Sequence, residues 1–237
     1  MKPVKILDIS DMQNGFTREN GNLYVQGARD IIDPINKFLH QVRNGVFDYT
    51  FIILDTHFAE EYSRSEEGKI FPLHCEFGTS DWELAVDVSK LPNKRYLLKN
   101  QFSMWGTRGN QDIVFHDPKR KKAYDTLFHI LDNPHDPTTK DPRDKFIHAM
   151  SPECNAAGIE VTIIGVTSDY CNRYAMEGWL SRGARVTIIQ DLTKGIQKET
   201  PEILNECQYQ HYKSGRLQAV SSTEYLRDLA DTMKREE

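Results

Sequence analysis

Side chains capable of catalysis stand at the ends of several short apolar runs in this 237-residue sequence. They are Asp11, Asp55, Lys99 and Cys171, which come from distant parts of the chain. Because an open parallel sheet binds its ligands beyond the carboxyl ends of its strands, we expect these side chains to meet at one rim. A cysteine nucleophile, a carboxylate base and a cation form a workable set for acyl transfer. The sequence therefore predicts a catalytic group of Asp11, Lys99 and Cys171.

Each member of this group also has an ordinary structural explanation. Asp11 could cap a turn, Lys99 could be a solvated surface lysine, and a lone cysteine is more often a core residue. Cys171, however, falls in the first turn of an expected helix, which Ser168 or Asp169 can cap. A helix dipole and a nearby cation both lower a thiol pKa, and the thiolate is the reactive form. This position favours the role of nucleophile for Cys171.

A second group contains ligand types that transition metals prefer. Asp55 and His57 lie one residue apart at a strand exit, and Glu67 and His74 follow in the next loop. A carboxylate with two imidazoles suits Zn²⁺, Fe²⁺ or Mn²⁺. The alternative is that each residue only makes local hydrogen bonds in its loop. The spacing therefore indicates one divalent metal ion, without selecting among the three.

The elements that must position these residues alternate along the chain. Short apolar, β-branched runs predict strands, at Val4–Ile9, Tyr49–Leu54, Tyr96–Leu98, Glu160–Val166 and Arg185–Ile189. Apolar residues at helical spacing predict helices, over 28–43, 170–182 (with Tyr170 and Tyr174 in its apolar stripe) and Thr223–Met233. Strands alternating with helices predict an α/β fold of three layers, with a mainly parallel sheet covered on both faces.

The segment 106–150 does not follow this alternation. It contains a helix-like piece, Tyr124–Leu131, and then a tract rich in proline and aspartate. We interpret it as an insertion that forms a surface excursion, with a lid or an oligomer contact as the alternative.

Composition narrows the class of protein. The length and the 38% content of hydrophobic residues fit one domain, residues 1–237, with one full core. The net charge of −5 and the absence of a long basic block do not suggest a nucleic-acid partner. The sequence contains no run of 18 apolar residues, so it predicts no membrane span. The first apolar stretch is too short for a signal peptide. Four cysteines without a CxxC motif indicate a reduced, cytoplasmic protein.

Five sequence motifs together resemble the isochorismatase-like cysteine hydrolases, and within them the nicotinamidases. In chain order they are DMQNGF at 11–16, DTH at 55–57, FPLHCEFGT at 71–79, KNQFS at 99–103 and GVTSDYC at 165–171. They stand in the family's order, and the resemblance extends over residues 4–195. Two positions depart from the family pattern, because Gly15 replaces an aspartate and Thr56 replaces an aromatic residue.

The resemblance implies roles for individual residues. It places the catalytic aspartate, lysine and nucleophile on Asp11, Lys99 and Cys171. It implies metal ligands at Asp55, His57 and His74, with Glu67 in place of a second histidine. Glu60, Glu61 and Glu66 are alternatives to Glu67.

The resemblance also implies a substrate site. Phe16, Phe71 and Phe102 fall where the family places aromatic walls, although core packing is an alternative for each. The backbone N–H groups of Thr167 and Cys171 would meet the oxyanion, with a cis peptide bond after Val166.

The implied reaction is hydrolysis of nicotinamide to nicotinate and ammonia through a Cys171 thioester, in the salvage of NAD breakdown products. The implied cofactor is one divalent metal ion, zinc first, with iron or manganese as alternatives. A related cysteine amidohydrolase acting on another small amide or carbamoyl compound is the alternative enzyme. A catalytically silent scaffold and a metal-storage or sensor protein are alternatives from other classes. The number of subunits stays open, and a homo-oligomer is one alternative.

Overall fold

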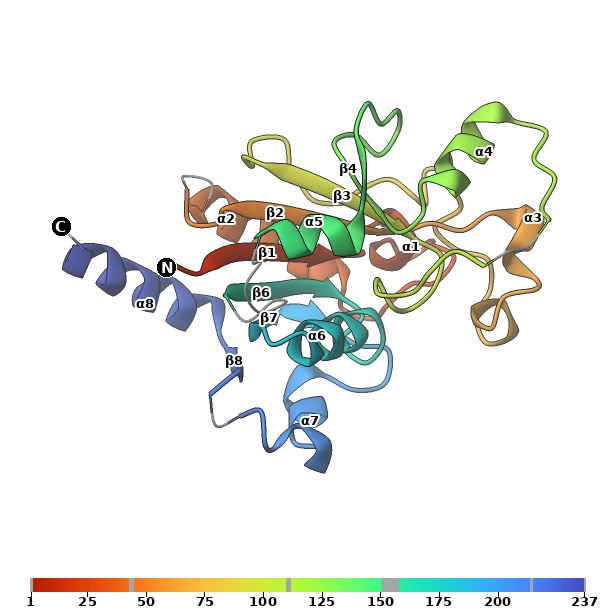
Figure 1. Ribbon diagram of the computed structural model, residues 1–237. Helices are drawn as coiled ribbons and strands as arrows, with labels where there is room; N and C mark the ends of the chain where they lie inside the picture. Colours follow the sequence, from red (N-terminus) through yellow and green to blue (C-terminus); the bar gives the residue numbers. More distant parts are fainter. Residues whose placement is uncertain (1, 43–44, 110–111, 151–157, 214, 237) are drawn as a thin grey trace.

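A single twisted sheet runs through the centre of the computed structural model, which describes residues 2–42, 45–109, 112–150, 158–213 and 215–236 (Figure 1). Its strands in chain order are β1 (Val4–Ser10), β2 (Tyr49–Asp55), β3 (Lys94–Lys99), β4 (His129–Leu131), β5 (Lys140–Pro142), β6 (Ile159–Val166), β7 (Arg185–Lys194) and β8 (Leu217–Val220). Their order across the sheet is β5-β4-β3-β2-β1-β6-β7-β8. Across the sheet, the neighbouring strands β3, β2, β1, β6, β7 and β8 all pair parallel. The strands β4 and β5 pair antiparallel at the edge beside β3. The predicted α/β fold with a mainly parallel sheet is confirmed, and all five predicted strands are present.

Helices cover both faces of this sheet. The α-helices are α1 (Asn14–Thr17), α2 (Ile32–Val42), α3 (Ala59–Tyr62), α4 (Pro118–Asp125), α5 (Arg143–Met150), α6 (Cys171–Ser181), α7 (Thr200–Leu204) and α8 (Ser222–Glu236). Short 3₁₀ helices are η1 (Arg29–Ile31), η2 (Glu67–Lys69) and η3 (Cys207–Tyr209). The three helices predicted from spacing correspond to η1 with α2, to α6 and to α8. Among the described helices, none is long and apolar enough to cross a bilayer.

The two hydrophobic cores follow from the alternation of side chains along the strands. In β1, Leu7 and Ile9 point to one face and Ile6 to the other, because successive strand residues face opposite ways. On the first face the core includes Phe38 of α2, and on the second it includes Trp179 of α6. Burial on both faces explains why the central strands are continuous apolar runs.

The segment 106–150 differs from its prediction. The helix expected at Tyr124–Leu131 is wrong, because α4 ends at Asp125 and the last three residues of that piece form β4. Phe128 has a φ of 60° and donates its N–H to the carbonyl of Leu98, which turns the chain onto the edge of β3. A short apolar run does not by its periodicity distinguish a helix from a strand. The segment is therefore not only a surface excursion, since it widens the sheet and covers it with α5.

Below the carboxyl edge of the sheet, β1 carries one buried carboxyl group. Asp8 is fully buried and accepts hydrogen bonds from Ser10 Oγ at 3.0 Å and from Trp179 Nε1 at 3.2 Å. Burial raises the pKa of Asp8 to about 6, against the lowering effect of these two hydrogen bonds. The folded state therefore holds a proton that the unfolded chain releases at lower pH.

The stability that this proton contributes is expected to disappear as pH rises. It is fully present below the unfolded pKa of 3.8 and is lost by about pH 6. With about 1.4 kcal/mol per unit of pKa shift, the loss is about 3 kcal/mol. Asp8→Asn cannot titrate at this position. Between pH 4 and pH 6 the free energy of unfolding of the wild type should therefore fall by about this amount relative to that of Asp8→Asn. Urea unfolding of both proteins at equal metal loading measures this, and parallel curves would contradict it.

Candidate active site and metal centre

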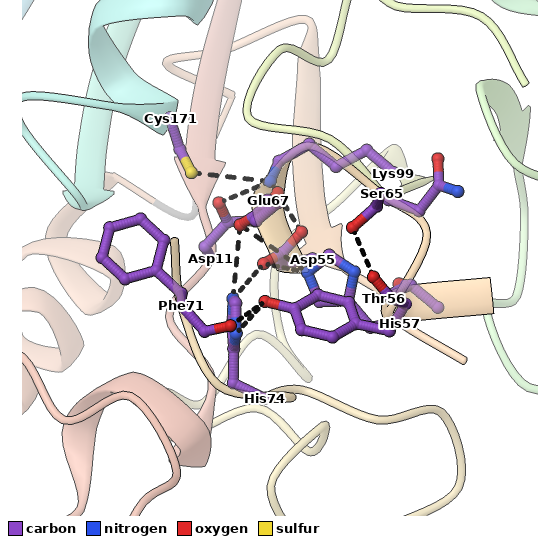
Figure 2. A network of polar contacts seen from close by, with 12 residues as sticks. Asp11, Asp55, Thr56, His57, Ser65, Glu67, Phe71, His74, Lys99 and Cys171 are labelled. Atoms are coloured by element: carbon purple, nitrogen blue, oxygen red, sulfur yellow. Dashed lines mark hydrogen bonds and ion pairs between the residues drawn. The ribbon is translucent and has the colours of Figure 1, made fainter. Parts of the chain in front are cut away.

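The carboxyl ends of three neighbouring strands and the start of α6 bring four of the predicted residues together (Figure 2). Asp11 directly follows β1, Asp55 ends β2, and Lys99 ends β3. The register pairs Asp55 with Lys99. Cys171 is the first residue of α6, after β6, which pairs with the other side of β1. The expected convergence of these residues is present in the structure, while their catalytic roles stay predictions.

Lys99 connects all three of the other residues. Its Nζ lies 3.0 Å from Asp11 Oδ2, 3.0 Å from Asp55 Oδ1 and 3.5 Å from Cys171 Sγ. The lysine is 1% exposed, so water does not solvate its charge. Burial lowers the pKa of Lys99, but the Asp11 and Asp55 carboxylates outweigh burial and hold that pKa well above its usual range. The group is therefore a permanent buried cation.

Asp11 has the protonation behaviour of a base that can be switched near neutral pH. It is fully buried with a φ of 50°. Burial raises its pKa to about 6, although the Lys99 charge acts in the opposite direction. A carboxylate with this pKa is ionised at neutral pH and can still return a proton, as general acid–base catalysis requires.

The Cys171 thiol differs from the sequence expectation in two respects. Neither Ser168 nor Asp169 caps α6, because the N-cap residue is Tyr170 and no side chain caps it. The carboxylate of Asp169 instead accepts backbone N–H groups of residues 196–198. Burial, and next the Asp11 charge, raise the pKa of Cys171 well above its usual range despite Lys99. The expected lowering of this pKa is therefore wrong, and the Cys171 side chain is a protonated thiol at neutral pH.

The turn before Cys171 requires a close approach of two strands. Gly165 has a φ of 109°, and a Cβ on it would lie 2.1 Å from the carbonyl oxygen of Ser10. The expected cis peptide between Val166 and Thr167 is present. Asn172, which sequence reasoning missed, fastens this turn, because its Nδ2 donates to the carbonyl of Gly165 at 2.9 Å and its N–H donates to that of Thr167 at 3.0 Å.

The four predicted metal ligands form one compact cluster. The ligand atoms of Asp55, His57, Glu67 and His74 all lie within 4.8 Å of one another, and all four residues are buried. Asp55 Oδ2 is 3.1 Å from His57 Nε2 and 3.0 Å from His74 Nε2, and Glu67 Oε1 is 3.7 Å and 3.5 Å from the same two nitrogens. Tetrahedral zinc with bonds of about 2.0–2.1 Å needs ligand separations of roughly 3.3 Å. The spacing therefore fits a divalent ion.

The orientation of the cluster also fits a metal ion. His74 Nδ1 lies 2.8 Å from the carbonyl of Pro72, to which it can donate, and this leaves Nε2 free to bind a metal. Tyr62 Oη donates to the same carbonyl at 3.0 Å and contacts His74 Nδ1 at 3.2 Å. Within the described chain, Glu67 Oε2 is buried without a hydrogen-bond partner. A buried carboxylate oxygen without a partner is costly unless a cation binds nearby.

The structure distinguishes Glu67 from its three alternatives. Glu66 is exposed and pairs with Lys69, while Glu61 accepts a hydrogen bond from Asn100 Nδ2 at 2.6 Å. Glu60 pairs with an arginine of α4. Glu67, the first residue of η2, alone of the four glutamates enters the cluster.

In the absence of metal, the cluster is held together by charge. Burial lowers the pKa of His74, but the hydrogen bonds that its ring donates to the carboxylates of Asp55 and Glu67 outweigh burial and raise that pKa to about 10. Burial raises the pKa of Asp55, yet His57 and Lys99 hold it well below its usual range. Metal binding would displace the imidazole protons, so it should release protons and weaken as pH falls.

The predicted aromatic walls separate into two groups. The ring of Phe71 lies 6.1 Å from that of Phe102, and both adjoin Tyr170, at 5.5 Å and 5.0 Å. Phe16 is not part of this group, since it is buried in the first core and contacts the His74 ring edge-on at 5.2 Å. Tyr174 stacks on Phe102 at 6.2 Å and is 40% exposed.

Sequence reasoning assigned Tyr170 and Tyr174 to the apolar stripe of the helix, and this assignment is wrong. A cavity of about 490 Å³ opens beside these rings, lined among others by Glu67, Phe102 and Tyr174. Tyr174 therefore lines this cavity, and Tyr170 packs against the rings of Phe71 and Phe102. Their positions at and just after the nucleophile motif are the signal that could have identified them.

Loss of metal ligands should abolish stabilisation by metal. Zinc at 100 times its Kd stabilises a specific site by about 2.7 kcal/mol. For a chain of this length we expect the Tm of chelator-treated protein to rise by about 5–10 °C. Differential scanning calorimetry should show this rise in the wild type and not in His74→Ala. His116→Ala, which removes an exposed histidine, is the matched control, and loss of the zinc effect there would contradict a site at the cluster.

The chain has relatives among proteins of known family. Residues 5–116 match the family model of the Isochorismatase domain. A nicotinamidase of Saccharomyces cerevisiae is 22% identical, over 86% of this chain and 93% of that protein.

Solved structures share the fold over nearly the whole chain. The pyrazinamidase of Pyrococcus horikoshii in complex with zinc is 22% identical with a TM-score of 0.60, covering 92% of this chain and 99% of that one. A nicotinamidase of Bacillus subtilis is 21% identical with a TM-score of 0.61, covering 93% and 100%. The resemblance found in the sequence motifs is thereby confirmed. The chain therefore matches the Isochorismatase domain over residues 5–116 and shares the fold of these solved structures over more than nine tenths of its length.

Proposed function

We propose that the chain hydrolyses nicotinamide to nicotinate and ammonia through a thioester on Cys171. The base is Asp11, the buried cation is Lys99, and one divalent metal ion is held by the carboxylates and imidazoles of the cluster. A nicotinamidase and a pyrazinamidase among the relatives support an aromatic amide as the substrate.

The observation that carries this proposal is the position of the Lys99 ammonium between the thiol and the metal cluster. Its Nζ contacts Asp11 Oδ2 and Cys171 Sγ on one side and Asp55 Oδ1 on the other. A metal-storage protein would have no use for a thiol and a second carboxylate at this point. A silent scaffold would have no need to bury an ammonium among two carboxylates, since such burial is costly.

The reaction begins with a protonated thiol. Asp11 accepts the proton of Cys171, and the Lys99 charge stabilises the thiolate that forms. The sulfur then attacks the amide carbon, and the oxyanion accepts hydrogen bonds from the backbone N–H groups of Thr167 and Cys171. Losing one such donor typically lowers the rate by about 10²–10³.

The second half of the reaction returns the same proton. Asp11 gives it to the departing nitrogen, and the C–N bond breaks. Ammonia is released, and a thioester on Cys171 remains. Water then attacks the thioester carbon while Asp11 takes a proton from it. The carboxylic acid is released, and the thiol of Cys171 is restored.

The metal centre and the aromatic rings would orient the substrate. A bound divalent ion supplies a Lewis acid to which a pyridine nitrogen can bind. Phe71 and Phe102, with Tyr170 beside them, offer flat apolar surfaces for a ring. Zinc is the first choice because two imidazoles and two carboxylates at this spacing suit it, and iron or manganese are alternatives.

A related amidohydrolase acting on another small amide is the second candidate. The cavity beside the site is also lined by Arg64, Ser65 and Gln101, polar groups that the ring of nicotinamide would not need. A carbamoyl compound or a substituted aromatic amide could use them.

We place the activity in the salvage of NAD breakdown products, in a reducing compartment such as the cytoplasm. A nucleophilic thiol loses its activity on oxidation, so reducing surroundings favour it. Among the described cysteines, Cys75, Cys171 and Cys207 are free, whereas Cys154 lies outside the described residues.

The thiol is expected to be indispensable for turnover. Zinc-loaded wild type should release ammonia from nicotinamide, and Cys171→Ala should lower kcat by roughly 10³-fold or more, because no thioester can form. Cys207→Ala, which removes an exposed free cysteine, should keep full activity. A coupled ammonia assay measures all three. Release of ammonia from another amide but not from nicotinamide would favour the second candidate. Release from no amide would refute the proposal that the protein is an amidohydrolase.

The rate should depend on the ionisation of Asp11. Its pKa of about 6 means that the base is increasingly protonated, and so inactive, as pH falls below this value. kcat/KM should therefore fall about tenfold per pH unit below pH 6 and be level above it. The metal content must be measured at each pH, because acid also weakens metal binding. A level profile in fully loaded protein down to pH 5 would contradict the assignment of Asp11.

A further inference from the structure

In Figure 1, α4 lies near α3, to which it is joined by the pair of Arg120 and Glu60. It belongs to the segment 106–150, for which the sequence suggested no chemical role. One of its side chains, Arg120, contacts Glu60 of α3 and Glu76 in the loop that carries His74.

Arg120 uses its whole guanidinium to join two separate stretches of chain. Its Nε and Nη2 donate to the two carboxylate oxygens of Glu60 in α3, at 2.9 Å and 2.6 Å. Nη2 also donates to Glu76 Oε1 at 2.9 Å, and Nη1 donates to the carbonyl of Phe77 at 2.9 Å. The guanidinium carbon lies 5.5 Å from the centre of the Phe58 ring. Such a planar set of donors fixes its partners in direction as well as in distance.

The two stretches joined by Arg120 are those that present the histidines of the cluster. Glu60 stands three residues after His57, and Glu76 stands two residues after His74. Their backbones are already paired, because His57 donates its N–H to the carbonyl of Cys75 at 3.1 Å and accepts the N–H of Phe77 at 2.9 Å. Arg120 therefore closes a bridge that begins at one imidazole-bearing loop and ends at the other.

This contact is sheltered enough to matter energetically. The side chain of Arg120 is 18% exposed, and those of Glu60 and Glu76 are 27% and 25% exposed. Bidentate pairs of arginine with carboxylate are stronger than ordinary surface ion pairs, which contribute little. Other cations of α4 pair elsewhere, since Lys121 pairs with Asp125 and Lys122 with Asp136.

We propose that Arg120 is a positioning residue for the metal centre, which holds the His57 and His74 loops at the separation that a divalent ion needs. The segment 106–150 thereby sets the affinity for metal without supplying a ligand. The inference rests on the proposed metal site at Asp55, His57, Glu67 and His74.

The sign of the effect separates positioning from electrostatics. Arg120 is a positive charge near a site for a cation, so its removal should strengthen metal binding if charge alone mattered. If Arg120 positions the ligands, its removal must weaken metal binding. Residues that orient metal ligands from outside typically change metal affinity by about 10–100-fold when they are replaced.

The experiment is a competition for Zn²⁺ between the protein and a chromophoric chelator, with no substrate present. Arg120→Ala should raise the Kd for zinc by about 10–100-fold. Arg120→Lys, which keeps the charge but not the planar donors, should raise it by a smaller factor. Lys122→Ala, which removes one positive charge from the same helix, should leave the Kd within about twofold, since its pair with Asp136 is exposed.

A double-mutant cycle tests whether the effect passes through the loop. Glu76→Gln should raise the Kd in the wild-type background and have little further effect in Arg120→Ala, because the contact is already lost. Far-ultraviolet circular dichroism on each metal-free variant confirms that the comparison is between folded proteins, and Arg120→Lys serves if Arg120→Ala does not fold.

Two outcomes would overturn the inference in distinguishable ways. A wild type that binds no zinc would remove the metal centre itself and the inference with it. A wild type that binds zinc, with an unchanged or lower Kd in both Arg120 variants, would leave the metal centre in place and refute the positioning role of Arg120.

Discussion

The ammonium of Lys99 is a charge enclosed by the protein, and the arrangement of the site depends on neutralising it. An ammonium removed from water costs several kcal/mol unless carboxylates stand against it. Asp11 and Asp55 do so at 3.0 Å each, which requires the ends of β1, β2 and β3 to lie side by side in register. Asp55 then turns its other oxygen to His57 and His74. The ion pair of Lys99 and Asp55 thus links the thiol of Cys171 to the cluster of predicted metal ligands.

The loops around this centre are irregular, and their geometry comes from contacts outside the sheet. Between β2 and β3 the chain carries three of the four predicted ligands without a long helix or strand to hold them. Tyr62 fixes the carbonyl that orients His74, and Arg120 bridges the flanks of both histidines. The helix α4 therefore contacts the loops that carry the histidines, although it contributes no predicted metal ligand.

Sequence reasoning predicted the fold and the meeting of the site residues because both depend on regular patterns. Buried parallel strands are recognisable as apolar runs, and their carboxyl ends locate Asp11, Asp55, Lys99 and the start of α6. Glu67 was placed in the metal group by its ligand type and position, and the resemblance selected it over Glu60, Glu61 and Glu66. The departure from the family pattern at Gly15 has a steric explanation, because a Cβ at this position would lie 2.9 Å from Cys75 Sγ.

The failures arose where tertiary contacts decide the outcome. The strands β4, β5 and β8 are only three or four residues long, too short for a periodic signal. The raised thiol pKa of Cys171 results from burial, which a residue's position in the sequence does not reveal. The contacts of Asn172 and Arg120 join residues that are distant in the sequence or fall within a turn that no pattern predicts.

The contacts of the buried Lys99 ammonium affect which groups can stabilise the oxyanion of a reacting amide. Within the described chain, the Lys99 ammonium donates hydrogen bonds to Asp55 and Cys171 and forms an ion pair with Asp11. The two carboxylates already neutralise the ammonium, so little of its charge is left for a carbonyl oxygen as long as these contacts persist. We therefore expect stabilisation of that oxygen to come from the main chain, at the turn where Gly165 lets β6 approach β1. In the proposed reaction, side chains would transfer the proton and backbone N–H groups would stabilise the oxygen, so the two tasks could change independently.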